Sequence, residues 1–509
     1  MQARQFNMNT VIRANAAIHA DRLAMVDGAL RITHRELGDR IDRLAQWLSD
    51  QGIARGDRVA LLLLDSAPFM ELMLAAGRIG AIAVTLNWRL TKSELAYILE
   101  NSAPALLLHN PRFADLVTPR PDMALFTVED SYALDQDYHR IATDHPPGGP
   151  FPDLPGDLPL YMMYTSGTTG RPKGCLQSNN GTAAAALAFV TRRALHRDDR
   201  LLSTNPIFHV AGLSQVFSAL AAGGSVVFPP RDADPAAMLE MVLREGCTMG
   251  SPVPQILVPW RELQRESGRT LPFRRYTTAA GMGNPARLNW LADGWNCAIT
   301  GGYGQTEIGG WSTFIDYPEM LAHPRSLGWP LPHLDMAILD DNGNILADGK
   351  EGEIALRGPS VMLGYWNNPE ASEAALGHGW LRTGDVGRRD DNGLFYLLGR
   401  SKELIKTGGE NVYPAEVDEV LLRLPAVADV GIAGVKDRKW GEAVKAFIVL
   451  KPGMALTRAE VSAWCKQHIA GYKRPRYIEF VERLPRDHYG KLRRRELSQM
   501  PVTPDQAAD

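Results

Sequence analysis

The stretch from Thr165 to Lys173 contains the residue types that bind a polyphosphate. Glycines let backbone N–H groups turn inward as an anion nest, hydroxyl groups donate further hydrogen bonds, and a lysine adds a point charge. The spacing differs from that of a Walker loop, and Pro172 disfavours the alternative of a flexible surface turn. We therefore predict that a triphosphate is bound by Thr165, Ser166, Gly167, Thr168, Thr169, Gly170 and Lys173.

Further motifs follow this loop in a fixed order. They are Gly302-Tyr303-Gly304-Gln305-Thr306-Glu307, Tyr365-Trp366, Trp380 to Asp385, Gly399 to Lys406, Gly409 to Pro414, and Leu484-Pro485-Arg486 leading to Gly490-Lys491. Together the motifs resemble the adenylate-forming superfamily, which includes acyl-CoA synthetases, nonribosomal peptide adenylation domains and firefly luciferase. The resemblance covers about residues 10 to 496 and is greatest to AMP-forming acyl-CoA synthetases.

The resemblance implies a two-step ligase reaction. The carboxylate of an acid attacks the α-phosphate of ATP and expels pyrophosphate, and the thiol of coenzyme A then attacks the acyl adenylate. Protein groups must neutralise phosphate charge and hold the first attack in line. A stand-alone adenylation enzyme that loads a carrier protein is the alternative, and a luciferase-like oxygenase is a weaker one. A non-catalytic nucleotide-binding scaffold is disfavoured because Lys491, Glu307 and Asp385 are all present.

The resemblance also implies roles at the ATP site. Glu307 is implied as the Mg²⁺ ligand, and a hard carboxylate suits that ion. Asp385 can accept both ribose hydroxyls in charge-assisted hydrogen bonds, and Arg400 is implied as a second ribose or phosphate contact. Lys491 is implied to bridge the carboxylate and the α-phosphate. The ATP set is thus the loop with Tyr303, Gly304, Gln305, Thr306, Asp385, Arg400 and Lys491, and the catalytic set is Lys491, Glu307, Thr306 and His209.

His209 resembles the histidine at the acyl pocket of the family, although a lone histidine among apolar residues is otherwise more often a core residue. The segment from Thr277 to Pro285 differs from the Gly-Gly-Ala-Pro-like loop that relatives usually carry beside adenine and substrate. Small residues in the implied pocket favour a medium-to-long-chain or aryl acid over acetate. The implied pocket residues are His209, Ala211, Gly212, Gly281, Gly301, Gly302 and Trp311.

Gly408, Gly409 and Glu410 resemble the loop that lines the pantetheine tunnel for coenzyme A, and Lys402 occupies the hinge position. Rotation about that hinge would withdraw Lys491 and bring Gly408 to the cleft. A purely structural turn is the alternative for the two glycines. Between residues 471 and 496, nine Lys or Arg stand against four Asp or Glu, which suits the phosphates of coenzyme A or a solvated face.

The elements that must position these residues predict an α/β fold. An apolar run over Val59 to Leu64, helical spacing over Ala67 to Ile79 and a second run over Gly80 to Leu86 predict a βαβ unit of a parallel sheet. Short segments and turns between Leu331 and Leu398 predict a small β subdomain. We predict a large domain over residues 1–399, which binds ATP and the acid, and a small mobile α+β domain over residues 400–509.

Composition fits a globular enzyme. A chain of 509 residues exceeds one hydrophobic core, and 55 basic against 58 acidic side chains give no reason to invoke nucleic acid or an anionic membrane as partner. The four cysteines are far apart, which indicates reduced thiols. The uncharged stretch from Leu201 to Pro230 is broken by Pro and Gly, so we expect buried core and no stable membrane insertion. Without an apolar secretory segment at its start, the protein is expected in the cytoplasm, with a homodimer left open.

Overall fold

The computed structural model describes residues 6–129, 137–149, 151, 154–165, 171–230, 232–280, 285–293, 295–486 and 492–502. The chain packs into two compact units. The larger comprises Met1–Ala337, Ala355–Thr383 and Gly393–Phe395, and the smaller comprises Ile338–Ile354, Gly384–Asn392 and Tyr396–Asp509. The predicted α/β class, with a large N-terminal and a small C-terminal part, is confirmed.

A seven-stranded sheet in the larger unit carries the predicted βαβ unit. Strands β3 and β4 are parallel and α3 (Ala67–Ile79) joins them, as predicted. The sheet order is β18 (Gly364–Tyr365), β8 (Lys173–Ser178), β7 (Pro159–Thr165), β4 (Ile82–Thr85), β3 (Arg58–Leu62), β5 (Leu106–His109) and β6 (Ala124–Thr127). Strand β8 is antiparallel to β7, and β18 is antiparallel to β8. These three strands, which carry motif residues, lie at one edge of the sheet.

Both faces of this sheet are covered, because successive side chains of a strand point to opposite faces. Val59 and Leu61 lie in the core with α1 (Met8–Ile18), α2 (His34–Asp50) and α3. Ala60 and Leu62 lie in a separate core with α4 (Lys92–Ser102). Continuous apolar strands of this kind are typical of parallel sheets buried on both sides.

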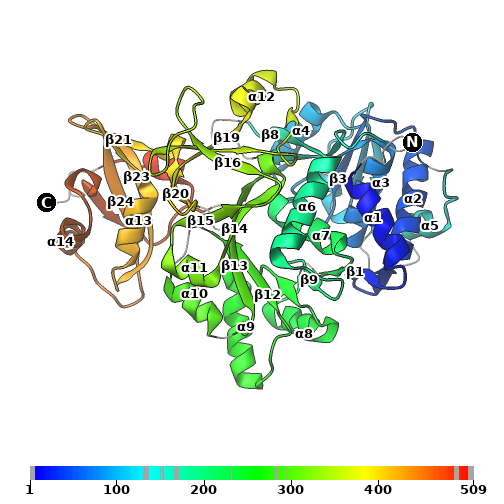
Figure 1. Cartoon of the computed structure of the whole chain (residues 1–509), viewed down its shortest axis with the longest axis horizontal. Coiled ribbons are helices and arrows are strands. Elements are labelled where there is room, and N and C mark those ends of the chain that lie inside the picture. The colour runs from blue at the N-terminus through cyan, green and yellow to red at the C-terminus, as the bar shows by residue number, and fades with distance from the viewer. Residues whose placement is uncertain are drawn as a thin grey trace. The chain divides into compact units, whose positions relative to one another are not determined.

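A second sheet of the larger unit places the other motif. Its order is β15 (Ser326–Pro330), β14 (Gly310–Asp316), β13 (Ala298–Gln305), β12 (Arg275–Ala279), β11 (Met249–Gly250), β9 (Arg200–Leu202), β10 (Ser225–Phe228), β1 (Leu23–Asp27) and β2 (Leu30–Thr33). Strands from β13 to β1 are parallel. One face packs on α6 (Asn179–Arg193) and α7 (Val210–Ala221), which lie side by side (Figure 1), and the other on α8 (Pro235–Glu245) and α9 (Pro254–Ser267).

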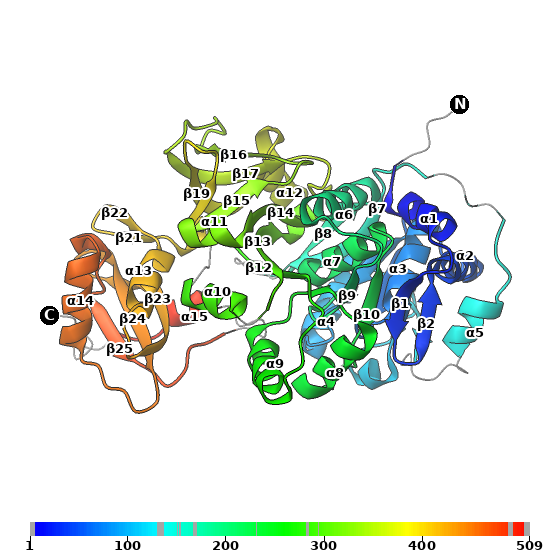
Figure 2. The same ribbon diagram turned by 60° about the horizontal axis from the view of Figure 1, so that its bottom comes forward.

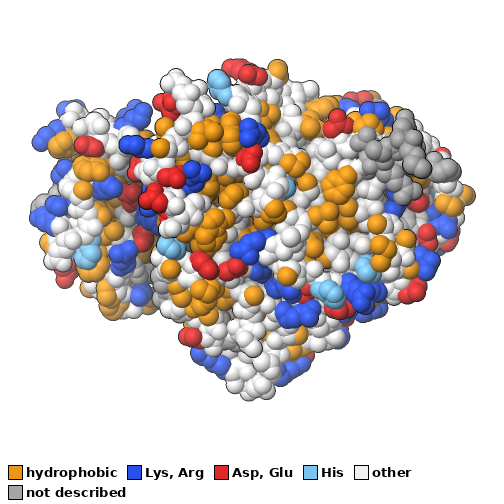
Figure 3. All heavy atoms as spheres, in the orientation of Figure 1, with side chains coloured by type: hydrophobic (Ala, Val, Ile, Leu, Met, Phe, Trp, Pro, Cys, Tyr) orange, Lys and Arg blue, Asp and Glu red, His pale blue; other side chains and the backbone are white. Residues whose placement is uncertain are grey.

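The uncharged stretch from Leu201 to Pro230 contains α7 and β10 and contributes to the buried core, as predicted. In the part of the chain that the structure describes, no helix is long and apolar enough to cross a bilayer. On the face shown in Figure 3, acidic and basic side chains are interspersed.

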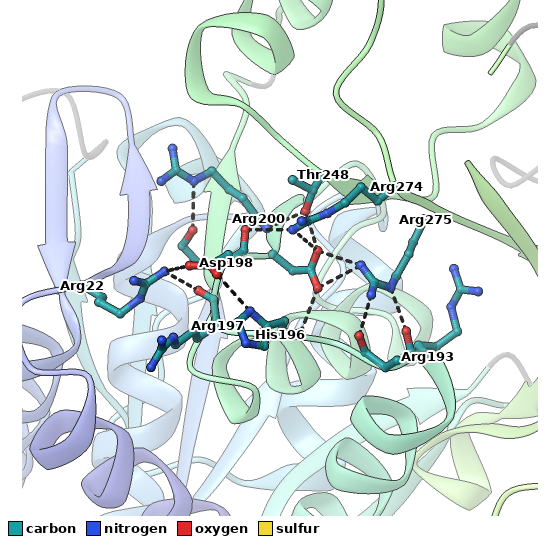
Figure 4. A network of polar contacts seen from close by, with 12 residues as sticks. Arg22, Arg193, His196, Arg197, Asp198, Arg200, Thr248, Arg274 and Arg275 are labelled. Atoms are coloured by element: carbon teal, nitrogen blue, oxygen red, sulfur yellow. Dashed lines mark hydrogen bonds and ion pairs between the residues drawn. The ribbon is translucent and has the colours of Figure 1, made fainter. Parts of the chain in front are cut away.

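Ion pairs hold the amino-terminal edge of the second sheet. The carboxylate of Asp199, just before β9, accepts from Arg274 at 2.8 Å, from Arg275 at 2.9 Å and from the hydroxyl of Thr248 at 2.8 Å (Figure 4). Asp199 is 2% exposed, so these partners compensate a buried charge. These contacts lie where the parallel strands begin, whereas ligands of open α/β sheets bind at the carboxyl ends of the strands.

The predicted β subdomain contains β16 (Asp335–Leu339), β17 (Glu351–Arg357), β19 (Leu381–Arg389) and β20 (Phe395–Arg400), in that order. Helix α12 (Pro369–Leu376) interrupts this region, which the pattern of short strands and turns did not predict. Its N-cap is Asn368, whose side chain accepts from the backbone N–H of Ala371 at 3.0 Å.

The smaller unit has its own sheet and core. The order is β22 (Glu410–Val412), β21 (Ile405–Thr407), β24 (Gly441–Leu450) and β23 (Val427–Asp437), with β25 (Tyr477–Phe480) also on β24. Helix α13 (Pro414–Leu422) packs on β23, and α14 (Arg458–His468) packs on α13 (Figure 2). The C-terminal region thus combines strands and helices, as predicted.

Candidate active site

The hairpin of β7 and β8 carries the predicted phosphate loop. Thr165 is the last residue of β7, Lys173 is the first of β8, and the two are paired across the hairpin. The loop residues Ser166, Gly167, Thr168, Thr169 and Gly170 lie outside the described residues. The structure thus places both ends of the loop, at the carboxyl end of a strand, where a helix or loop can meet a phosphate.

The motif from Gly304 to Glu307 lies at the carboxyl end of β13, whose last two residues are Gly304 and Gln305. A Cβ on Gly304 would lie 1.8 Å from the carbonyl oxygen of Gly310, so only glycine fits this irregular pairing of β13 with β14. The amide of Gln305 donates to the hydroxyl of Tyr303 at 3.1 Å and to the carbonyl of Thr383 at 3.2 Å. The end of β13 is therefore fixed by both backbone geometry and side-chain hydrogen bonds.

Two contacts hold the short helix η2 (Thr306–Ile308). The amide of Gln177, a buried residue of β8, donates to the carbonyl of Thr306 at 2.7 Å. The backbone N–H of Met362 donates to the carbonyl of Glu307 at 2.8 Å. Gln177 is a site residue that sequence reasoning missed, since a glutamine in a strand carries no local signal of such a contact.

Lys173 and Glu307 meet at Tyr365, on β18. The hydroxyl of Tyr365 donates to Oε1 of Glu307 at 2.9 Å, and Nζ of Lys173 lies 4.1 Å from the centroid of the tyrosine ring. Burial, and then the charge of Glu307, raise the pKa of Tyr365 well above its ordinary value. The phenol is therefore a neutral donor at physiological pH. The predicted metal ligand and the predicted phosphate cation share one tyrosine.

The donor set fits magnesium. Across the described ranges, no group of three or more His, Cys, Asp or Glu side chains could enclose a metal, and Glu307 supplies a single carboxylate. Mg²⁺ is commonly bound by one or two carboxylates together with substrate phosphates and water, and not by a complete protein cage. Glu307, near the ends of the phosphate loop, suits a metal that arrives with a nucleotide.

The predicted acid-pocket residues come from α7, β13 and β14. His209 is the residue before α7, and a Cβ on Gly212 would lie 2.4 Å from the carbonyl oxygens of Asn205 and Pro206. This close approach requires glycine and brings the start of α7 against the preceding loop. Ala211, between them, is partly exposed.

Gly302 and Trp311 are in contact, whereas Gly301 faces away. A Cβ on Gly302 would lie 2.5 Å from Cε3 of Trp311, so the indole covers this glycine. A Cβ on Gly301 would instead lie 2.8 Å from Cε of Met320, because alternate residues of a strand point to opposite faces. The predicted pocket residue Gly281 lies outside the described residues.

A polar and aromatic cluster borders His209 and was not predicted. The carboxylate of Asp65 accepts from the backbone N–H of Ile207 at 2.9 Å, and burial raises the pKa of Asp65 to about 7. The guanidinium of Arg89 lies 4.7 Å from the ring centroid of Trp88 and 5.8 Å from that of Phe208. These residues come from separate parts of the chain, so only the fold could reveal the cluster.

The predicted ribose contacts Asp385 and Arg400 pair within the smaller unit. Nε of Arg400 lies 3.0 Å from Oδ1 of Asp385, whose side chain is 4% exposed. The preceding turn is held because the backbone N–H of Gly384 donates to Glu353 at 2.8 Å. Gly384 has φ of 72°, a left-handed conformation that favours glycine. The buried carboxylate of Asp385 is thus paired with the guanidinium of Arg400, a group type that donates well to phosphate oxygens.

The predicted hinge residue Lys402 is exposed in the short helix η4 (Ser401–Glu403). Its neighbour Glu403 lies 3.0 Å from Arg494, and Arg494 donates to the carbonyl of Ile432 at 2.7 Å and pairs with Asp418. Lys491 lies outside the described residues. Arg486 and Leu492, the described residues on either side of the segment that contains Lys491, form an isolated antiparallel β-bridge.

The predicted coenzyme A loop is a tight turn between β21 and β22. Gly408 and Gly409 have φ of 59° and 86°, and a Cβ on Gly408 would lie 2.7 Å from the ring of Trp440. Glu410 opens β22. Lys439 and Arg476 lie 4.9 and 5.0 Å from the centroid of Trp440, which makes this an aromatic surface flanked by cations.

A cavity of about 200 Å³ also involves Arg476. It is lined by Ser462, Cys465, Lys466, Gly471, Arg474, Pro475, Arg476 and Ile478. Two of these cations belong to the basic stretch that the sequence singled out, and Lys466 comes from α14. The basic surplus therefore forms a concave surface in part, which suits phosphate groups.

Two family models match the chain. The model of the AMP-binding enzyme matches residues 12–366, and that of the AMP-binding enzyme C-terminal domain matches residues 416–491.

Curated relatives are similar over nearly the full length. A feruloyl-CoA synthase from Amycolatopsis sp. is 35% identical over 96% of this chain and 97% of its own. The long-chain-fatty-acid–CoA ligase FadD13 of Mycobacterium tuberculosis is 33% identical over the same shares. Among solved structures, O-succinylbenzoate coenzyme A synthetase (MenE) from Bacillus subtilis, in complex with ATP and magnesium ion, has a TM-score of 0.82 at 30% identity and covers 96% of this chain and 98% of its own.

Proposed function

The chain belongs to the AMP-binding enzyme family, and we propose that it is an acid–CoA ligase that makes acyl-CoA, AMP and pyrophosphate through a bound acyl adenylate. The observation that carries this proposal is the meeting of Lys173 and Glu307 at Tyr365, beside the ends of the phosphate loop. The arrangement supplies a cation for phosphate oxygens and a carboxylate for a metal. Two relatives that are similar over nearly the whole chain are named as enzymes that join acids to coenzyme A, which supports the same reaction.

ATP and Mg²⁺ are the cofactors of the first step. Mg²⁺, when bound with ATP, neutralises phosphate charge as pyrophosphate leaves. We assign its protein ligand to Glu307, with Thr306 and Gln305 setting the backbone around it. The loop from Thr165 to Lys173 holds the β- and γ-phosphates. Tyr303 lies against adenine, with Gly304 in the same ATP site. Asp385 binds the ribose, and Arg400 contacts the ribose or a phosphate.

The acid pocket suits an apolar substrate. His209, Ala211 and Gly212 at the start of α7, with Gly302 under the indole of Trp311, offer apolar and aromatic surface around one imidazole. Such walls favour a medium-to-long-chain or aryl acid. Of the two relatives, FadD13 is named for long-chain fatty acids and the feruloyl-CoA synthase for an aryl acid.

Coenzyme A is the second substrate. We propose that Gly408, Gly409 and Glu410 line the path of its pantetheine, because no atom lies within 4 Å of a Cβ on Gly409 and Gly408 packs against the ring of Trp440. The ring of Trp440 and the cations at the cavity, Arg474 and Arg476, suit the adenine and phosphates. Residues 400–509 would turn as a domain against residues 1–399, with Lys402 as the hinge.

A panel of acids tests this function. Pyrophosphate release is measured with fatty, aryl and branched acids, each with and without coenzyme A, and thioester is measured with free coenzyme A. We expect one class of acid to give both products. Pyrophosphate without thioester would favour the alternative, an adenylation enzyme that loads a carrier protein. Pyrophosphate release with none of the acids would reject the ligase.

We propose that the enzyme acts in the cytoplasm. Light scattering tests the further hypothesis that it forms a homodimer.

Loss of the Glu307 carboxylate and loss of the Asp385 carboxylate are expected to have different effects on metal and nucleotide binding. Glu307→Ala should raise the Mg²⁺ concentration for half-maximal pyrophosphate release by about tenfold or more, since a metal ligand is lost. Asp385→Ala should weaken ATP binding by about tenfold at saturating Mg²⁺, because a charge-assisted hydrogen bond is lost. Titrations of metal at fixed ATP, and of ATP at saturating metal, separate the two effects. Identical metal dependence in both variants would contradict the separate roles.

A further inference from the structure

We propose that Tyr365 is a positioning residue of the magnesium and phosphate site, which sets the carboxylate of Glu307 and the ammonium group of Lys173 relative to each other. This inference rests on the proposed function. Its motif, Tyr365-Trp366, stood out in the sequence without a role. The structure places its phenol between two residues that lie 134 positions apart in the chain, 173 and 307.

The first contact orients the carboxylate. A glutamate side chain rotates easily, and a hydrogen bond to one oxygen selects one orientation. Tyr365 donates to Oε1 of Glu307 at 2.9 Å. Hydrogen bonds to metal-ligating carboxylates usually matter to metal affinity by a factor of ten or more.

The second contact restrains the lysine. Nζ of Lys173 lies 4.1 Å from the centroid of the Tyr365 ring, within the range of a cation–π interaction. An aromatic face attracts the cation without neutralising it. The ammonium group therefore keeps its charge for phosphate oxygens while its long stem is held in place.

The backbone of Tyr365 is itself fixed to both partners. It pairs with Cys175 of β8, two residues after Lys173, and the N–H of Trp366 donates to the carbonyl of Gly174 at 2.7 Å. Three residues earlier, the N–H of Met362 donates to the carbonyl of Glu307. The N–H of Tyr365 donates to the hydroxyl of Ser372 at 2.8 Å. A residue held in this way can position others within the small tolerance that catalysis demands.

Two substitutions separate the two contacts. Tyr365→Phe removes the hydroxyl and keeps the aromatic face, whereas Tyr365→Leu removes both. Binding of a non-hydrolysable ATP analogue is measured by calorimetry over a range of Mg²⁺ concentrations, without any acid. Tyr365→Phe should raise the Mg²⁺ needed for half-saturation by about tenfold and leave nucleotide affinity at saturating Mg²⁺ near wild type. Tyr365→Leu should in addition weaken nucleotide binding at saturating Mg²⁺ by about threefold.

A matched control comes from a second tyrosine with the same kinds of contact. The hydroxyl of Tyr396 donates to Asp390 at 3.0 Å, and the guanidinium of Arg388 lies 4.4 Å from the centroid of the Tyr396 ring. Tyr396→Phe should leave the Mg²⁺ dependence unchanged. In a Glu307→Gln background, Tyr365→Phe should add no further effect, since its route through Glu307 is already lost.

The proposal is overturned if Tyr365→Phe lowers the melting temperature and leaves the Mg²⁺ dependence as in the wild type, or if its effect adds fully to that of Glu307→Gln. Nucleotide binding is read without the acid, so a failed acid panel would reject the ligase and leave this test intact. If the wild type does not bind the analogue, the proposed ATP site and the role of Tyr365 fall together.

Discussion

Lys491→Ala is expected to slow formation of the acyl adenylate by about 10²–10³, the scale for the loss of one preorganised charge contact in a transition state. The family resemblance assigns Lys491 to the first step alone, where it bridges the carboxylate and the α-phosphate. Formation of the thioester from supplied acyl adenylate should therefore stay near the wild-type rate. Single-turnover release of pyrophosphate measures the first step, and acyl-CoA formation from the synthetic adenylate measures the second.

Arg493→Gln is the control for this prediction. Arg493 is two residues away, and its guanidinium pairs with Glu496 at 2.9 Å on an exposed surface. Exposed pairs of this kind contribute little to stability. Its substitution should leave both steps near wild type. An equal loss of both steps in Lys491→Ala would remove the assigned role and indicate damage to the small unit instead.

Lys402→Pro is expected to stall the enzyme between its two steps. Proline fixes φ near −65° and removes a backbone donor, and where this conflicts with the required conformation it costs about 3 kcal/mol, or roughly a hundredfold in a rate. If the resting arrangement is the one that makes the adenylate, the variant should release pyrophosphate in a single turnover. A bound acyl adenylate should then accumulate despite excess coenzyme A, since the smaller domain cannot turn.

Lys402→Ala is the matched control, because it removes the same exposed side chain and leaves the backbone free to rotate. It should make acyl-CoA close to the wild-type rate. Quenched samples analysed for adenylate and thioester over time distinguish the variants. Thioester formation by Lys402→Pro at the wild-type rate would mean that the hinge lies elsewhere between Gly399 and Glu403, or that no rotation is needed.

Local patterns were enough to predict much of the fold. The apolar run of β3, the helical spacing of α3 and the run of β4 follow from side-chain periodicity, which is a property of each segment alone. Helix α12 was missed because it is short and lies among turn residues, where a β pattern seemed continuous. The ordered motifs were enough to identify the family. Binding of phosphates and a metal restricts these positions to glycines, hydroxyl groups and charged side chains.

The sequence by itself determined the α/β class and the family, and it predicted which residues bind ATP, because these depend on residue types and on spacing along the chain. Only the tertiary structure decided that Tyr365 joins Lys173 to Glu307, that Asp385 pairs with Arg400, and that Gly302 faces Trp311 while Gly301 faces Met320. The first of these contacts depends on which strands become neighbours, and strand order is set by the packing of the whole sheet and not by any local pattern.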